Sequence, residues 1–429
     1  MAEAVFERYD ALLIDLDGVL YRGDEPVAGA AAVLERVRAA GRRVVFLTNN
    51  SSRTPEDVAG KLRGMAIPAD ASEVLTSSLA TAALLRREVT GGPRTAFVIG
   101  GRGIREALES AGVRLVDRAA HHADLVVVGW DPGATYDDLR TAGLLVQRGA
   151  RLIGTNPDGS YPASDGLWPG AGALLAAVVA TTGADPTVVG KPAAPMFDAA
   201  VELARARSPL VIGDRLDTDI AGAAAMGLDS LLVLTGAARP SDLIPAPTLP
   251  TYLGSSVAAV ERDIPRVDVR AAAEPDRHDV EALVHDAGLP VQQTPAAGDS
   301  LVGVRASGST GDIVVTATTF RIGENAVLRA VAVRTDLRGS GLGTLMTAAA
   351  ARRALENGAA RVFAFTETAE RFFTGLGFRP VERSELPPDV AGSEHATGAC
   401  ATATALVFDP AGTRPTPPAE PRERPVALA

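Results

Sequence analysis

"ALLIDLDGVLYRGDEPV", residues 11–27, runs from an apolar, strand-like segment directly into two carboxylates, Asp15 and Asp17, followed by Gly18. Side chains alternate between the two faces of a strand, so both carboxylates would point to the same face. Like charges that lie so close repel each other unless a positive group lies between them. The stretch therefore predicts a cation-binding site at the end of a buried strand.

Short apolar runs alternate with alanine-rich helical stretches, such as 29–41 and 219–227, from residue 10 to about 235. This alternation predicts parallel sheets covered by helices, with ligand sites at the carboxyl ends of the strands. The predicted strands are 11–16, 43–48, 95–100, 124–129, 151–155, 209–214 and 230–236.

The rhythm changes after residue 236. Residues 237–266 are rich in proline and serine, which is typical of a linker or of the last edge of the first module. A second unit follows from about 267 to 408, with a predicted helix at 274–288 and antiparallel strands. The tail, residues 409–429, has too little apolar surface to offset its chain entropy and is predicted to be disordered.

The composition is that of a soluble globular protein. A chain of 429 residues usually forms about two or three domains. The net charge of -10 argues against nucleic acid or an anionic membrane as the main partner. A single cysteine, Cys400, and the lack of a signal-like or bilayer-spanning apolar stretch lead us to expect a cytoplasmic protein.

Lysine is rare in this chain. Of the 42 basic residues only Lys61 and Lys191 are lysines, and all the others are arginines. A lysine kept against that bias is expected to need its compact ammonium. Lys191, in "VVGKP", could offset negative charge on both an attacking carboxylate and a phosphoryl group.

Two further motifs complete a phosphoryl-transfer pattern. Thr48 ends a strand, and its hydroxyl could bind phosphate oxygens together with the amides of Asn49 and Asn50. Another strand ends in "GDRLDTD", which supplies Asp214 and Asp219. Each motif alone also fits a solvated turn, a calcium loop or a helix cap, so the signal lies in their joint order.

In this order the motifs assign chemical roles. Asp15 would be a carboxylate nucleophile and Asp17 a proton donor and acceptor. Mg²⁺ would be bound by carboxylate oxygens. The predicted magnesium ligands are Asp15, Asp17, Asp214 and Asp219.

The set resembles the four motifs of the haloacid dehalogenase (HAD) superfamily, and in particular its p-nitrophenyl phosphatase subgroup, over about residues 10–240. The resemblance implies an α/β fold with a HAD-like Rossmannoid parallel-sheet core at 1–81 and 184–260 and an inserted α/β cap at 82–183. In this subgroup the cap forms the leaving-group pocket. The corresponding candidates here are Trp130, Asp131, Asn156 and Asp158, although simple loop and turn roles fit them equally well.

A second constellation lies near residue 340, where a strand, a glycine-rich loop and a helix follow one another. Consecutive amides at such a helix start form a cradle for a pyrophosphate. The loop consists of Arg338, Gly339, Ser340, Gly341, Leu342 and Gly343.

This order resembles the acetyl-CoA site of GNAT acetyltransferases of the arsinothricin N-acetyltransferase type. The resemblance covers about residues 267–408 and implies a C-terminal α+β domain. Many GNAT enzymes use a tyrosine as general acid, but this chain has Phe373 there and has no tyrosine after Tyr252. An active transferase and a module kept for packing, dimerisation or acetyl-CoA sensing both remain open.

A phosphatase of this subgroup followed by a GNAT-like domain resembles the actinobacterial glycerol-3-phosphate phosphatases. That resemblance implies D-glycerol 3-phosphate as the first substrate, with 2-phosphoglycolate or pyridoxal phosphate as alternatives. The expected partners are a small phosphorylated metabolite and acetyl-CoA, and a homodimer is compatible with the sequence. The alternatives of another class are an N-acetyltransferase with a vestigial phosphatase half and an acetyl-CoA-sensing regulator.

Overall fold

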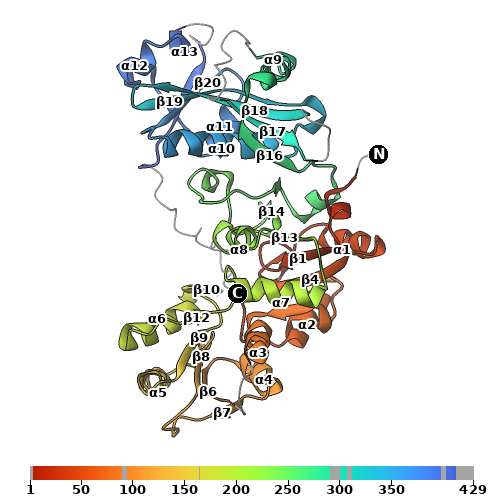
Figure 1. Ribbon diagram of the computed structural model, residues 1–429, viewed down its shortest axis with the longest axis vertical. Helices are drawn as coiled ribbons and strands as arrows, with labels where there is room; N and C mark the ends of the chain where they lie inside the picture. The colour runs from red at the N-terminus through yellow and green to blue at the C-terminus, as the bar shows by residue number, and fades with distance from the viewer. Residues whose placement is uncertain are drawn as a thin grey trace, which may run out of the picture. The chain divides into compact units, whose positions relative to one another are not determined.

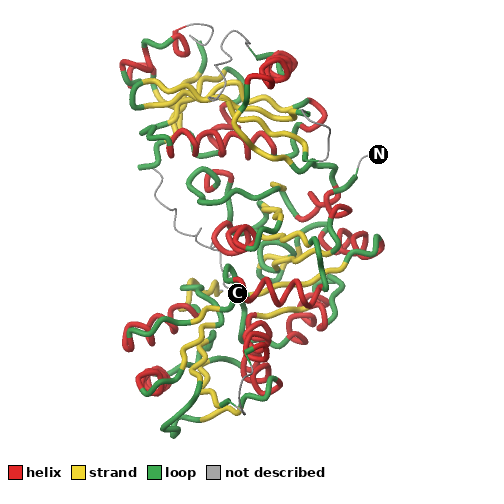
Figure 2. The backbone as a smooth tube through the Cα atoms, in the orientation of Figure 1, coloured by secondary structure: helices red, strands yellow, loops and turns green. Residues whose placement is uncertain are grey.

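The computed structural model describes residues 3–88, 94–163, 165–289, 300–306, 312–397 and 402–411. Three sheets of five or more strands organise these residues (Figures 1 and 2). Each of the strands predicted between residues 11 and 236 is confirmed, and so are the helices predicted within 29–41, 219–227 and 274–288.

The first sheet has the strand order β15-β14-β13-β1-β4-β5. The first four residues of β1 are fully buried, which is typical of a central strand of a parallel sheet covered on both faces. β1 pairs in parallel with both β4 and β13. The strands are β1 (Ala11–Asp15), β4 (Arg43–Thr48), β5 (Val74–Thr76), β13 (Pro209–Gly213), β14 (Asp229–Val233) and β15 (Tyr252–Gly254).

A small hairpin and several helices accompany this sheet. The hairpin, β2 (Tyr21–Arg22) and β3 (Glu25–Pro26), follows directly after β1 and Asp17. Helix α2 begins with a capping box, in which Thr54 and Asp57 bond each other's backbone amides. The helices are α1 (Ala30–Ala39), α2 (Pro55–Gly64), α3 (Ser77–Arg87), α7 (Ala194–Ala204) and α8 (Ala221–Ala225).

The second sheet has the all-parallel order β12-β9-β8-β6-β7, and all of its strands except β12 lie within the predicted cap. Successive side chains of β8 point to opposite faces of the sheet. Val127 packs in one apolar cluster with Ile104, and Val126 packs in another with Leu145. Helices therefore cover both faces of this sheet. Its strands are β6 (Thr95–Ile99), β7 (Arg114–Val116), β8 (Leu125–Val128), β9 (Arg151–Gly154) and β12 (Thr187–Val188).

The second sheet also carries a hairpin and its own helices. These are β10 (Ser160–Ala163), β11 (Gly166–Pro169), α4 (Arg102–Ser110), α5 (Tyr136–Gln147) and α6 (Ala171–Thr182). β12 follows the predicted cap boundary at residue 183 yet pairs with β9. The domain boundaries themselves stay a prediction.

Residues 237–266 contain β15, the edge strand of the first sheet. This strand favours the last edge of the first module over a linker, and the assignment of the segment stays a prediction. Tyr252, at the start of β15, is fully buried.

The third sheet has the order β16-β17-β18-β19-β20-β22-β21. β19 and β20 pair in parallel, and the other pairs are antiparallel. The sheet is therefore mixed, where the sequence indicated only antiparallel strands. Its strands are β16 (Val267–Ala271), β17 (Ser300–Arg305), β18 (Ile313–Ile322), β19 (Asn325–Val333), β20 (Val362–Thr366), β21 (Arg379–Val381) and β22 (Thr404–Phe408).

Helices α9 and α10 lie on opposite faces of the third sheet (Figure 1). Val302 of β17 packs in one cluster with Val284 of α9, whereas the next residue, Gly303, faces Met346 of α10. The helices here are α9 (Arg277–Asp286), α10 (Leu342–Glu356), α11 (Glu370–Gly375), α12 (Pro388–Ala391) and α13 (Glu394–Thr397).

The chain forms two compact units. One unit contains residues 6–213 and 217–229, and the other contains 214–216 and 230–411. β14 and β15 thus group with the third sheet. Among the described residues, none of the helices has the length and apolar character needed to cross a membrane. Most of the predicted disordered tail, from 412 on, lies outside the described residues.

Candidate active site

Asp15 is the last residue of β1, and its side chain is largely buried. Asp17 follows two residues later, just before Gly18, whose φ of 80° lies in the left-handed region that favours glycine. Part of the Asp17 side chain is exposed to solvent, and protein atoms pack around the rest of it. Burial raises the pKa of its carboxyl, and the charge of Lys61 opposes part of that rise.

Lys191 is a buried ammonium, with only 3% of its surface exposed. Its Nζ donates hydrogen bonds to Asp15 Oδ1 and, at 2.7 Å, to Asp219 Oδ1. Burial alone would lower the pKa of Lys191, but the two carboxylates outweigh it and hold this pKa above its usual value. Lys191 is therefore charged at every physiological pH.

Three carboxylates gather at the carboxyl end of the first sheet. One oxygen each from Asp15, Asp214 and Asp219 lies within 4.8 Å of the others, an arrangement that could hold a metal ion. Asp214 directly follows β13, and Asp219 lies in a π-helical turn, Leu216–Ile220. An all-oxygen set of this kind suits Mg²⁺. Among the described residues the group does not include Asp17.

Thr48 is the last residue of β4, which lies beside β1 in the sheet, and Asn49 and Asn50 follow it. The backbone N–H of Asn50 donates to Thr48 Oγ1 at 3.1 Å. The side-chain oxygen of Asn50 accepts from both the amide and the hydroxyl of Ser52. The Asn49 side chain bonds the backbone of Lys191. Both asparagine side chains are therefore engaged within the protein, while the Thr48 hydroxyl stands at the strand end.

The predicted pocket residues of the cap separate into two groups. Trp130 stacks on Tyr161 with ring centroids 3.9 Å apart, and Asp131 accepts the amide of Gly133 within its own turn. Asn156 Nδ2, by contrast, donates to Asn49 O at 2.7 Å, and Asp158 Oδ2 accepts from Asn49 Nδ2 at 3.0 Å. Asn156 and Asp158 thus contact Asn49, in the loop that follows β4.

The cap packs closely on the loop that follows β4. A Cβ at Gly129, just after β8, would lie 2.6 Å from Ser51 Oγ, and one at Gly101 would lie 2.9 Å from Ser52 Cβ. Ser51 Oγ also accepts the amide of Trp130 at 3.1 Å. Glycines therefore let the carboxyl ends of the cap strands approach the loop directly.

Sequence reasoning missed Lys61 as a neighbour of the site. Its Nζ lies 4.2 Å from the ring centroid of Tyr21 and 3.6 Å from Asp24 Oδ1, both in or beside the β2–β3 hairpin. The sequence held a signal for it, because Lys61 is the other of the two lysines. Tyr21 and Tyr161 carried no comparable signal.

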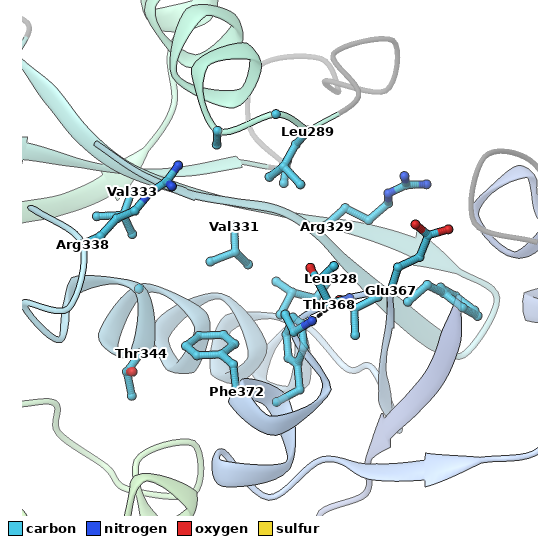
Figure 3. Close-up of a pocket in the computed structure, with 18 of the residues that line it drawn as sticks. Leu289, Leu328, Arg329, Val331, Val333, Arg338, Thr344, Glu367, Thr368 and Phe372 are labelled. Atoms are coloured by element: carbon cyan, nitrogen blue, oxygen red, sulfur yellow. Dashed lines mark hydrogen bonds between the residues drawn. The ribbon is translucent and has the colours of Figure 1, made fainter. Parts of the chain in front are cut away.

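A second site lies in the third-sheet domain, as a cavity of about 780 Å³ beside the glycine-rich loop (Figure 3). Arg338 lies at one end of it, and Arg329 and Glu367 lie at the other. Of the predicted loop, Arg338, Gly339, Gly341 and Gly343 line the cavity. Ser340 and Leu342 are buried and do not belong to the lining. Phe373 lines it at the position where a tyrosine was expected.

Three protein families match parts of this chain. A haloacid dehalogenase-like hydrolase family matches residues 12–114, and a HAD-hydrolase-like family matches residues 188–260. The acetyltransferase (GNAT) family matches residues 279–378. The chain belongs to the haloacid dehalogenase-like hydrolases, as a phosphoric monoester hydrolase that carries a C-terminal GNAT domain.

Two relatives and one solved structure are similar to this chain over most of its length. The chain is 38% identical over 263 residues to the D-glycerol 3-phosphate phosphatase of Mycobacterium tuberculosis, covering 61% of this chain and 73% of the relative. It is 38% identical over 262 residues to the acid sugar phosphatase of Staphylococcus aureus, covering 60% of this chain and all of the relative. The crystal structure of the M. tuberculosis glycerol phosphate phosphatase in complex with magnesium matches with a TM-score of 0.66 and 29% identity, over 88% of this chain and 98% of that one.

Proposed function

We propose that this chain is a magnesium-dependent D-glycerol 3-phosphate phosphatase that acts through an aspartyl phosphate on Asp15. The observation that carries the mechanism is the buried ammonium of Lys191, bonded to both Asp15 and Asp219. It offsets the charge that would otherwise keep a phosphate dianion away from a carboxylate nucleophile. The substrate rests on the likeness to the M. tuberculosis phosphatase, which includes a structural match over most of this chain.

The reaction comprises two in-line displacements. A carboxylate oxygen of Asp15 attacks phosphorus while the bond to the leaving alkoxide breaks, and Asp17 protonates that alkoxide. Asp17 then accepts a proton from a water that attacks the aspartyl phosphate, which releases inorganic phosphate and restores Asp15. The raised pKa of Asp17 suits its role as proton donor. Magnesium held by Asp15, Asp214 and Asp219 would neutralise phosphate charge.

The mechanism is tested by Asp15→Asn, which is isosteric but cannot act as the same nucleophile. Phosphate release from p-nitrophenyl phosphate should fall to the background level, and wild-type release should stop when EDTA removes magnesium. Retention of most activity by Asp15→Asn would overturn the aspartyl-phosphate mechanism.

The substrate is tested by comparing kcat/KM for D-glycerol 3-phosphate, 2-phosphoglycolate and pyridoxal phosphate. We expect the highest value for D-glycerol 3-phosphate. Equal efficiency on all three esters would show that it is not the dedicated substrate.

A second function, acetyl-CoA binding, is favoured by the cavity beside the glycine-rich loop. Amides at the start of α10 could bind a pyrophosphate, whereas acetyl transfer would also need proton handling that Phe373 cannot supply. We therefore expect the full-length chain to bind acetyl-CoA in calorimetry. Acetyl transfer to a supplied amine would show that the domain is a second enzyme. Absence of acetyl-CoA binding would indicate that the domain serves only for packing.

A further inference from the structure

The side chain of Asn49 joins three segments that are far apart in the sequence. Its Oδ1 accepts the backbone N–H of Lys191 at 2.8 Å, and its Nδ2 donates to the carbonyl oxygen of Lys191 at 3.1 Å. The same Nδ2 donates to Asp158 Oδ2 at 3.0 Å. One amide thus holds both backbone polar groups of Lys191 and is itself held by a carboxylate of the cap.

The chain before Lys191 is built for this contact. Val189 and Gly190 donate their amides to the carbonyls of Gly154 and Thr155, which extends the β12–β9 pairing up to Lys191. A Cβ at Gly190 would lie 2.6 Å from Asn49 Oδ1, so glycine allows the approach. Asn49 therefore makes the final contact that fixes where the Lys191 side chain starts.

Asp158 reinforces the orientation that the Lys191 backbone N–H and C=O also favour for the Asn49 amide. A carboxylate can only accept hydrogen bonds, so the NH₂ end of Asn49 must face Asp158. That orientation leaves Oδ1 toward the Lys191 amide, the donor that it accepts. Hydrogen bonds to a charged acceptor are about twice as strong as neutral ones, so the preference is firm. Asn156 supports the arrangement by donating to Asn49 O and accepting from the amide of Asp158.

We propose that Asp158 is a positioning residue for the catalytic lysine, acting through Asn49. The cap carboxylate orients the Asn49 amide, and the amide holds the backbone of Lys191 so that its ammonium meets Asp15 and Asp219. This role is additional to the leaving-group contact predicted from the sequence for Asp158, which stays a prediction, and it rests on the proposed phosphatase mechanism. We refer to the three residues as the Asp158–Asn49–Lys191 relay.

The relay is tested by steady-state kinetics of Asp158→Ala with two substrates of different leaving groups. Because the chemical step depends on Lys191, kcat should fall about tenfold or more for both p-nitrophenyl phosphate and D-glycerol 3-phosphate. KM should stay within about twofold for both. Asp117→Ala is the matched control, since within the described residues that cap carboxylate accepts a hydrogen bond only from the nearby Ala119 amide, and it should match wild type.

Two further variants separate the relay from a merely structural role. Asp158→Asn keeps an acceptor oxygen and should recover most of the kcat lost in Asp158→Ala, even if the alanine variant folds poorly. In a double-mutant cycle, Asn49→Ala with Asp158→Ala should be no slower than Asn49→Ala alone, because Asp158 acts only through Asn49.

Three outcomes would overturn the proposal. They are a rise in KM confined to D-glycerol 3-phosphate with p-nitrophenyl phosphate unaffected, multiplicative losses in the double variant, and equal losses in Asp158→Asn and Asp158→Ala. If the wild-type enzyme hydrolyses p-nitrophenyl phosphate but not D-glycerol 3-phosphate, the substrate assignment fails, and p-nitrophenyl phosphate still reports on the relay.

Discussion

Lys191 is the residue whose chemical type the site tolerates least. It is buried, and its compact ammonium bonds two carboxylates at once. The planar guanidinium of Lys191→Arg is bulkier and cannot take the same position between them. We expect kcat for p-nitrophenyl phosphate to fall about a hundredfold, as when a preorganised charge contact is lost. Turnover near that of wild type would show that charge alone is sufficient.

Lys61, the other lysine, holds the β2–β3 hairpin next to Asp17. Its ammonium lies over the ring of Tyr21 and near Asp24, and such a cation–π contact contributes about 0.5–2 kcal/mol. Lys61→Met should therefore loosen the hairpin and lower kcat/KM several-fold. Lys61→Arg keeps a cation over the ring and serves as the control. Identical kinetics for the two variants would mean that the cation–π contact is not what matters.

Residue types were predictable where the chemistry demands them. Asp15, Lys191 and Asp219 follow from the motifs because carboxylates and an ammonium are needed at strand ends. The contacts of Asn49 were not predictable, since its partners lie 109 and 142 positions away and only the tertiary fold brings them together. Asp158 was selected from sequence for contact with the leaving group, and that role stays a prediction without a contact in the structure to support it.

The cap elements support the segment that leads to Lys191. The last residue of β9 and the residue that follows it supply the carbonyls that accept from the amides of Val189 and Gly190, just before Lys191. Replacing residues 94–183 with a short linker should therefore lower kcat for p-nitrophenyl phosphate as well as for D-glycerol 3-phosphate. Circular dichroism of the shortened protein would establish that the remaining core is folded. Undiminished hydrolysis of p-nitrophenyl phosphate would show that the cap serves only to select substrates.

The glycine-rich loop packs on β15. Gly339 and Gly341 both have positive φ, 73° and 89°, but only at Gly341 would a Cβ meet a neighbour, Leu253 O at 2.6 Å. An alanine at positive φ destabilises by more than about 1 kcal/mol, and at 341 the collision adds to that strain. Gly341→Ala should lower Tm more than the control Gly339→Ala in thermal unfolding. Equal Tm values would contradict a close contact with β15.

Long strands were easier to predict from the sequence than short ones. The long apolar runs of β1, β4 and β13 carry clear strand signals, whereas β12 and β15 have two and three residues. Periodicity cannot be detected over so few positions, so these strands form because a neighbouring strand offers backbone partners. The sequence analysis also missed the β10–β11 hairpin, because its strands are short and one of its contacts is distant in sequence. Its Tyr161 stacks on Trp130, about 30 positions earlier in the chain.

At the scale of the whole molecule, acetyl-CoA should stabilise more than the domain that binds it. The loop at Gly339 and Gly341 contacts Arg262 and Leu253, and β15 is an edge strand of the first sheet. A ligand present at about 100 times its Kd stabilises the folded state by about 2.7 kcal/mol. We therefore expect saturating acetyl-CoA to slow the thermal inactivation of phosphatase activity, with CoA-free buffer as the control. If acetyl-CoA binds without slowing this inactivation, acetyl-CoA binding and phosphatase activity are lost independently on heating.

The close packing of Leu253 against Gly341 also bears on how such a two-part enzyme can be assembled from separate genes. An acetyltransferase module with any residue other than glycine at position 341 would place a Cβ 2.6 Å from Leu253 O. Residues 230–266 belong to the same compact unit as the module. In a chimera they should therefore travel with it, even though their strands complete the sheet of the phosphatase. The unit of exchange is then larger than the acetyltransferase fold.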